Sequence, residues 1–597
     1  GDSIGIEIRG QVATGNFEWT ADNFAGFYYD IDDDLGTETL TTIITEGNKL
    51  QEPNGVTYTT TAQKNDFDFE DWGYYNVIGF LGQRYFASYG TDYGYGTSTE
   101  ILEEANVTNL LEYGELAEIL IDGYQEDVLD LSKSIDLKEN YSLKLKVGTD
   151  NKGMLIELLK DKKTVDKKAL LMPGTYTYST KIGEAPRMPI IVAHFQEPIF
   201  LEGKGYIKLD GLWQISENPI YVGRGTSFGL MTVTTIDPVS GLITMNNLDN
   251  TITLNKNKVI SLMGDFNIKT SDQDVVDDAN PLRYYIAKEV TEPGTYEVRG
   301  AVADGDFTWH PMNFAGFYYD IDDDLGTETL TTTITEGNKL EEPNGITYTT
   351  TAQKNDFDFE DWGYYNVIGF QASKYFAGYL NDENVPDENE ILFKESDDEN
   401  SLSDEQLEAI LMDDDTEMTV TSGTPLKLEE GYELSIKSID IDSNKVYLKL
   451  TKDGSAVDSK VISPSKGWAT MADKTYYYKK DVGDSKDLVI IAAHFKNAFR
   501  GADQNLATID GIWQISEVPT EVKADTEYDK MRIATVTSDT ITMDNKDNTV
   551  TLSKNNEIDL MGDVKIKTAD QDVIDDANPL RYYIFKSHEI VPAGGSL

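Results

Sequence analysis

Residues 23–80 begin NFAGFYYDIDDDLGTETL and end TYTTTAQKNDFDFEDWGYYNVIGF, and the same letters return at residues 313–370. The two copies differ at three positions only, which are Ile43/Thr333, Gln51/Glu341 and Val56/Ile346. A tandem repeat of this length constrains the architecture more strongly than any single motif does. The chain is therefore expected to contain two homologous units built from the same elements.

Strand signals run through both units, because short segments rich in β-branched and aromatic residues alternate with turn clusters. In the first unit the expected strands near the repeat are residues 4–12, 27–29, 37–44 and 56–61. Farther along, apolar and polar residues alternate from residue 141 to 147 and again from 432 to 436, as they do in strands with one buried face. The expected fold is mainly β, with two β-sandwiches in each unit.

One stretch in each unit has helical spacing. In the first unit, a capping box at Thr97-x-x-Glu100 precedes the apolar residues Ile101, Leu102, Ala105, Leu116, Ile119 and Leu120. In the second unit, the corresponding residues are Ser403-x-x-Gln406, Leu407, Ile410 and Leu411. Because the shared L-x-x-I-L spacing puts these side chains on one helical face, we expect a short helix that covers the end of a sandwich in each unit.

The sequence divides into unit 1 at residues 1–292 and unit 2 at residues 293–597. A nested division explains the short joint between them, since both ends of a unit then share one sandwich. In unit 1, sandwich I takes about 1–125 plus 219–292, and sandwich II is inserted at about 126–218. In unit 2, the corresponding ranges are 293–418 plus 519–590 and 419–518. The alternative is a linear split near residues 125 and 418.

The charge balance is extreme, with 51 Lys and Arg against 106 Asp and Glu, for a net charge of −55. Such a field repels phosphate backbones and anionic membranes, so nucleic acid is excluded as a main partner and cations are favoured. The chain has no cysteine, which excludes disulfides, a thiolate nucleophile and sulfur-based zinc sites. The longest apolar runs have the length of strands, well short of a membrane helix.

Signatures of common enzyme classes are missing. The sequence contains no G-x-S-x-G, H-E-x-x-H, P-loop or strand-linked G-x-G-x-x-G motif. Of the four histidines, His194 and His494 are equivalent and lie in apolar strands, where a histidine is usually a satisfied core residue. Glycoside hydrolysis needs only two carboxylates at a set distance across a cleft, so the sequence leaves that activity open.

The densest acidic motif lies inside the repeat. Its alternating carboxylates and turn glycine provide oxygen ligands of the kind that Ca²⁺ prefers. The candidate ligands are Asp30, Asp32, Asp34 and Glu38, and in the second copy Asp320, Asp322, Asp324 and Glu328. The spacing departs from an EF-hand loop, and a solvated acidic turn is the alternative. We expect no required cofactor, with Ca²⁺ or other cations as candidate ligands.

Two N-glycosylation sequons occur, at Asn106-Val-Thr108 and Asn140-Tyr-Ser142. They make Asn106 and Asn140 the candidate glycosylation sites if the protein is exported. Neither sequon has a counterpart in unit 2.

A series of ordered segments carries a family resemblance. Each unit has R-G-x-V near its start, then N-F-x-G-F-Y-Y-D-I-D, G-T-E-T-L and Y-F-A-x-Y, and ends with G-[LI]-W-Q-I-S-E, I-T-M-x-N, L-M-G-D and P-L-R-Y-Y. This pattern resembles the S-layer duplication domain of methanogenic archaea, Methanosarcinales type, and it covers essentially the whole chain as two copies.

The resemblance implies a non-enzymatic structural protein of the extracellular cell surface. In that family each unit folds as paired β-sandwiches, and copies assemble into a porous two-dimensional lattice. The precursors carry a signal peptide and a C-terminal membrane-anchoring helix, neither of which is in this sequence. A strongly anionic lattice is expected to act as a protective coat and a charge-selective sieve. The alternatives are a secreted carbohydrate-binding or adhesive β-sandwich protein and a glycoside hydrolase.

Overall fold

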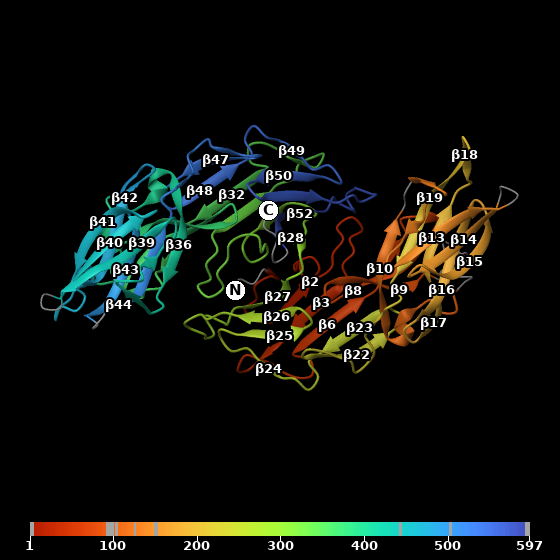
Figure 1. The fold of residues 1–597 in the computed structure, drawn as a ribbon, viewed down its shortest axis with the longest axis horizontal. Helices are drawn as coiled ribbons and strands as arrows, with labels where there is room; N and C mark the ends of the chain where they lie inside the picture. The colour runs from red at the N-terminus through yellow and green to blue at the C-terminus, as the bar shows by residue number, and fades with distance from the viewer. Residues whose placement is uncertain are drawn as a thin grey trace. The chain divides into compact units, whose positions relative to one another are not determined.

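The computed structural model describes residues 5–90, 101, 105–123, 127–148, 153–440, 444–500 and 504–591. The chain forms two compact units, one made of the residues up to Gly294 together with residues 589–591, and the other running from Thr295 to His588. Both consist of antiparallel sheets (Figure 1). The described residues contain no helix long and apolar enough to cross a membrane.

In unit 1, two sheets pair strands from the two ends of the unit. The first has the order β1 (Ile6–Arg9), β27 (Tyr284–Val290), β26 (Phe266–Thr270) and β25 (Val259–Met263). The second has the order β2 (Phe17–Thr20), β3 (Glu38–Thr42), β6 (Val56–Thr61), β23 (Leu242–Asn246), β22 (Met231–Asp237) and β21 (Ser227–Phe228). A small third sheet also joins the two ends of the unit, in the order β24 (Ile252–Thr253), β5 (Lys49–Leu50) and β4 (Ile44–Thr45).

Strands from the middle of unit 1 form a large sheet and a four-stranded sheet. The large sheet has the order β16 (Gly174–Ile182), β17 (Ala185–Phe195), β19 (Lys204–Ile215), β10 (Glu115–Gly123), β9 (Gln83–Tyr89), β8 (Tyr74–Phe80) and β7 (Gln63–Asp66). Three short strands join it, β11 (Asp127–Asp130), β18 (Ile199–Leu201) and β20 (Ile220–Tyr221). The four-stranded sheet is β12 (Ile135–Asp136), β13 (Tyr141–Val147), β14 (Gly153–Lys160) and β15 (Lys163–Leu171).

Unit 2 repeats this arrangement. The sheets that join its two ends are β28 (Gly294–Arg299), β52 (Tyr582–Ile590), β51 (Val564–Thr568) and β50 (Glu557–Met561); β29 (Phe307–Trp309), β30 (Glu328–Thr332), β32 (Ile346–Thr351), β48 (Thr540–Asp544), β47 (Met531–Val536) and β46 (Glu527–Tyr528); and β31 (Lys339–Leu340) with β49 (Val550–Thr551).

The middle of unit 2 forms the matching pair of sheets. The large sheet has the order β33 (Gln353–Asp356), β34 (Tyr364–Phe370), β35 (Ser373–Leu380), β36 (Gln406–Asp414), β44 (Asn505–Ile515), β43 (Ser485–Arg500) and β42 (Thr475–Val482), joined by β37 (Met418–Thr421) and β45 (Thr520–Glu521). The four-stranded sheet is β38 (Leu426–Lys427), β39 (Tyr432–Asp440), β40 (Lys445–Lys452) and β41 (Ser455–Ile462).

Two hydrophobic cores in unit 1 identify two sandwiches. One core joins the sheets made from both ends of the unit, for example Trp19 and Tyr58 with Phe266 and Tyr284. The other joins the four-stranded sheet to the large one around Trp213, whose indole N–H donates to the Tyr89 hydroxyl at 3.0 Å. The predicted fold class, tandem β-sandwiches in two homologous units, is confirmed.

The two ends of unit 1 lie in the same sheets. Strand β1 pairs with β27 from Ile6 opposite Val290, and β6 pairs with β23 from Thr57 opposite Asn246. This confirms the expectation that both ends of a unit share one sheet region. Residues 63–89 and 115–123 belong instead to the large sheet. The domain boundaries near 125, 219, 418 and 519 stay predictions.

The predicted helical stretches are strands. Residues 115–123 and 406–414 form β10 and β36, so the helix prediction for Leu116, Ile119 and Leu120, and for Leu407, Ile410 and Leu411, is wrong. The physical reason is a register shift between Ile119 and Ile121, repeated between Ile410 and Met412. This irregularity interrupts the period-two alternation and leaves a spacing that imitates a helical face. Of the capping residues, Thr97 and Glu100 lie outside the described residues.

Helical turns in the described residues are short. They are η1 (Glu70–Trp72) and η2 (Leu110–Tyr113) in unit 1, and η3 (Glu360–Trp362), η4 (Ser401–Asp404), α2 (Ile391–Glu395) and α3 (Met471–Lys474) in unit 2. Ser403 lies in η4 rather than at a helix cap, and Ile101 is helical. Residues 27–29, predicted as a strand, are not in one, because a side chain rather than a neighbouring strand accepts the Tyr28 N–H.

Candidate functional site

The acidic motif of unit 1 forms a tight turn. Asp30 and Leu35 exchange two backbone hydrogen bonds of 2.9 Å, and residues 31–34 make the turn between them. The Asp32 N–H donates to the Asp30 carboxylate at 3.0 Å, and the Tyr29 hydroxyl donates to Asp34 at 2.8 Å. Since Asp32, Asp33 and Asp34 are exposed, the turn presents concentrated negative charge to solvent.

Glu38 does not join this turn. Its side chain is 1% exposed, and its carboxylate accepts hydrogen bonds from the Tyr58 hydroxyl at 2.7 Å and from the N–H groups of Gly82 and Tyr28 at 2.8 and 3.0 Å. These donors occupy the carboxylate from inside the protein. Glu38 therefore has a structural role, linking β3 to β6 and to the turn between β8 and β9.

Unit 2 repeats both features. Asp320 and Leu325 close the same turn, the Asp322 N–H donates to Asp320 at 2.9 Å, and the Tyr319 hydroxyl donates to Asp324 at 2.7 Å. Glu328 is buried and accepts from Tyr348, Ala372 and Tyr318. Burial raises the pKa of Glu328 to about 7, against the opposing effect of these hydrogen bonds and of Lys586. Burial also raises the pKa of Glu38.

The structure therefore brings together only part of the predicted ligand set. The aspartates at 30, 32 and 34, and at 320, 322 and 324, share a turn in each unit, while the two glutamates face inward. Within the described ranges, no group of three or more His, Asp or Glu side chains is arranged to hold a metal ion. Metal binding at these turns stays a prediction.

Both sequon asparagines are exposed. The Asn106 N–H donates to the Arg187 carbonyl at 2.8 Å, which fixes the backbone and leaves the side chain at the surface. Asn140 lies in a tight turn with φ of 61° and its amide donates to Asp161 at 3.1 Å. Their accessibility is compatible with glycosylation, which stays a prediction.

The two equivalent histidines have equivalent partners in the two units, an aspartate and a phenylalanine in each. His194 Nδ1 lies 2.6 Å from Asp210, and His494 Nδ1 lies 2.5 Å from Asp510. Each ring stacks on a phenylalanine, with centroids 4.8 Å apart at Phe69 and 4.3 Å at Phe359. Burial lowers the pKa of His494, which Asp510 partly opposes. The expectation of satisfied core histidines is confirmed for His494.

Carboxylates also line an open hollow beside His194. Its volume is about 460 Å³, and its lining includes Asp68, Glu70, Asp71 and Asp210. Both carboxylate oxygens of Asp210 already form hydrogen bonds within the protein, one with the His194 ring and the other with the Gln196 side chain. Among the described residues that line it, the four carboxylates are joined by Gln196 and Phe69, a far more polar lining than that of a typical small-molecule pocket.

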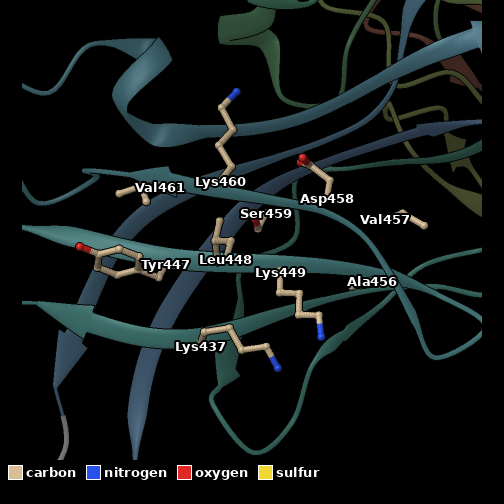
Figure 2. A pocket seen from close by; sticks show the side chains of 10 residues that line it. All are labelled: Lys437, Tyr447, Leu448, Lys449, Ala456, Val457, Asp458, Ser459, Lys460 and Val461. Atoms are coloured by element: carbon tan, nitrogen blue, oxygen red, sulfur yellow. The ribbon is translucent and has the colours of Figure 1, made fainter.

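A surface missed by the sequence analysis lies on the outer face of the four-stranded sheet of unit 2. We name it the lysine face and define it by Lys437, Tyr447, Lys449, Val457 and Val461. It borders an open groove of about 740 Å³. Figure 2 shows the Lys437 and Lys449 side chains extending from neighbouring strands in the same direction. Aligning the strand sequences of this sheet between the two units would have shown that the two copies differ in charge on this face.

Comparison with known proteins agrees with the two-unit architecture. The family model described as "S-layer protein" matches residues 9–272 and 299–570. The chain is 30% identical over 614 residues to the Major S-layer protein of Methanosarcina mazei, covering 97% of this chain and 83% of that protein. It is 29% identical over 605 residues to the Major S-layer protein of Methanosarcina barkeri, covering 97% and 82%.

The two matched segments correspond to the two structural units and leave out only their junction and the chain ends. This agreement joins the family match to the observed duplication of sheets, cores and acidic turns. The chain belongs to the S-layer protein family.

Proposed function

We propose that the protein is a structural subunit of a cell-surface layer, which assembles with copies of itself into a porous and strongly anionic sheet. The observation that carries this proposal is the match of the S-layer family model to two segments that run through both units. The Major S-layer proteins of three Methanosarcina species, each aligned to 97% of the chain, support the same role.

The physical properties of the chain suit a structural subunit of a layer. Each unit buries its own hydrophobic cores between antiparallel sheets. A rigid, duplicated subunit can make repeated contacts with its neighbours, as closed or extended assemblies require. No catalytic step is part of the proposed role.

The charge of the chain gives the proposed layer its selectivity. With a net charge of −55, pores lined by this protein would admit small cations and neutral solutes and repel nucleic acids and other large anions. Because the Debye length is about 8 Å at physiological ionic strength and shorter at high salt, this selectivity should weaken as salt is added.

Cations are proposed as counter-ions of the acidic turns. Calorimetry would test a specific site: a melting shift with millimolar Ca²⁺ that exceeds the shift in NaCl of equal ionic strength supports binding. Replacing Asp32 and Asp322 with Asn should remove that excess. Equal shifts in the two salts would leave only diffuse screening.

Electron microscopy of the concentrated protein tests the structural role. Two-dimensional arrays are the expected result. Monodisperse particles that bind or cleave glycans would contradict the proposal and favour the adhesive or hydrolytic alternative. Permeability of the arrays to a cationic and an anionic tracer of equal size, measured at low and high salt, then tests the sieve.

A further inference from the structure

The two copies of the four-stranded sheet differ at the centre of their outer face. Strands β14 and β40 end at the equivalent residues Lys160 and Lys452, and three residues earlier stand Glu157 and Lys449. The centre of the face therefore carries a carboxylate in unit 1 and an ammonium in unit 2. Substitution of one sign of charge for the other at the centre of a sheet face changes what the face can bind.

In unit 1 the central carboxylate is neutralised within the sheet. Lys146 Nζ lies 4.0 Å and Lys167 Nζ lies 3.3 Å from the Glu157 carboxylate, which also accepts the Thr164 hydroxyl. Glu157 faces Lys167 directly across the pair β14 and β15. This face therefore pairs the charge at its centre within the sheet.

The lysine face of unit 2 does not pair the charge at its centre in this way. Lys449 faces Ser459 across the pair β40 and β41, and within the part of the chain that the structure describes neither Lys437 nor Lys449 forms an ion pair with a carboxylate. Asp458 belongs to the other side, where it accepts the Tyr476 hydroxyl at 2.7 Å. Figure 2 shows Asp458 and Lys460 extending away from Lys437 and Lys449. Two cations thus remain available on the outer face.

Apolar side chains flank Lys449 on the same face, with Tyr447 and Val461 on one side of it and Val457 on the other (Figure 2). Tyr447 and Val461 face each other across β40 and β41, and they are 40% and 46% exposed, while Val457 is 40% exposed. A face that combines exposed apolar side chains with unpaired cations has the composition of a surface that binds a partner carrying carboxylates.

We propose that the lysine face binds a carboxylate-rich surface of a second copy of this chain. The inference rests on the proposed function, since it assigns one contact of the layer. Two copies with a net charge of −55 each repel one another, so a stable contact between them must bring cations to the interface. Lys437 and Lys449 supply such cations, and the exposed acidic turns at residues 30–35 and 320–325 offer the complementary charge.

The test compares two variants with the same change in charge. Lys437→Glu with Lys449→Glu reverses the lysine face, while Lys144→Glu with Lys146→Glu reverses two exposed lysines of the unit 1 sheet. The lysine-face variant should raise the protein concentration needed for array formation roughly tenfold or more, because it opposes like charges across the contact. The unit 1 variant should stay within about twofold of the wild type, and Lys437→Arg with Lys449→Arg should assemble normally.

A second measurement does not depend on a variant that folds. Wild-type arrays are made from an equal mixture of ¹⁴N- and ¹⁵N-labelled protein and treated with a zero-length carbodiimide. Mixed-isotope cross-links from Lys437 or Lys449 to Asp or Glu of another copy are expected. Circular dichroism of each variant checks that its fold is retained.

The outcomes separate the two proposals. Arrays of the lysine-face variant that match the wild type, with no mixed-isotope cross-link from either lysine, overturn the inference and leave the proposed function standing. Binding of the wild type to a sulfated polysaccharide, lost in the lysine-face variant while arrays persist, would assign the face to an anionic glycan and also overturn it. A wild type that stays monomeric at all concentrations overturns both.

Discussion

At the scale of single residues, buried polar side chains hold the two ends of each unit together. Asn247 is fully buried, and its side-chain oxygen accepts the Val56 N–H at 3.0 Å. Its side-chain NH₂ group donates to the backbone carbonyls of Leu50 and Asn250 at 3.1 and 2.8 Å. Asn545 makes the same three bonds in unit 2. Each asparagine thus links segments that are nearly 200 residues apart in sequence.

Replacing Asn247 with Ala should lower the free energy of unfolding of unit 1 by roughly 1–3 kcal/mol, because buried backbone groups lose their partners. Denaturant unfolding measures the change. Asn255→Ala, at an exposed position with the same change of side chain, should alter stability by less than about 0.5 kcal/mol. Equal effects of the two substitutions would show that the three bonds of Asn247 add little.

The buried carboxyl of Glu328 makes stability depend on pH. Its pKa of about 7 in the folded protein exceeds the value of about 4.3 of an unfolded glutamate. Between these pH values the folded state binds the proton more tightly, so the stabilisation is complete below about pH 4 and is lost as the pH rises through about 7. Glu328→Gln should therefore flatten the fall in melting temperature between pH 5 and pH 8.

The control for this prediction is Glu341→Gln, which removes an exposed carboxyl from the same unit. It should leave the slope of melting temperature against pH unchanged. Burial also raises the pKa of Asp413 to about 7 and that of Asp122 to about 6, so the slope in the Glu328 variant should shrink without vanishing. A slope identical to that of the wild type would contradict the assignment to Glu328.

At the scale of elements, β10 shows how one strand serves two cores. Leu116 packs in the core of the sandwich built from both ends of unit 1, whereas Ala117 packs in the core around Trp213. Adjacent side chains of a strand point to opposite faces, which allows this division. A helix would have placed Leu116, Ile119 and Leu120 on one buried face and Ala117 away from it. The strand instead buries Ala117 in the core around Trp213.

Enlarging Ala117 tests the strand. Ala117→Leu should destabilise unit 1 by about 1–3 kcal/mol, because a fully buried site in a packed core does not accommodate the added methyl groups. Leu120→Ala, at a half-buried position, should cost less. Chemical denaturation compares the two. A larger loss from the Leu120 variant would favour the helical face over the strand.

At the scale of the whole molecule, each unit has its own hydrophobic cores. The core around Trp19 draws all its residues from unit 1, and the core around Trp513 draws all its residues from unit 2. Trp309 occupies the position of Trp19 in unit 2, buried against Tyr582 at a ring distance of 5.7 Å. Each unit can therefore lose stability separately.

Calorimetry of the full chain tests this separation. Trp19→Ala should lower the melting temperature of one transition and Trp309→Ala that of another, each with a loss of about 3–5 kcal/mol in the affected unit. The double variant should show both shifts. Two single variants that move the whole transition together would show instead that the units unfold as one.

Much of the fold and part of the candidate site could be predicted from these residues. The alternation at residues 141–147 and 432–436 identified real strands, and the repeat identified two units. The acidic turn was located correctly, but Glu38 and Glu328 were grouped with it by spacing alone. Spacing did not reveal that the hydroxyls of Tyr58 and Tyr348, on a neighbouring strand, donate hydrogen bonds to these two carboxylates, which therefore face the protein interior.

The duplication, the β class, the strong net negative charge and the family follow from the amino-acid sequence alone, because these depend on local pattern, composition and ordered motifs. Only the folded chain shows which strands of residues 5–61 pair with which strands of residues 227–290, that β10 is a strand between two cores, and that Lys437 and Lys449 lie together on one outer face. These features depend on contacts between distant segments and on register, which change the environment of a residue without changing its local pattern.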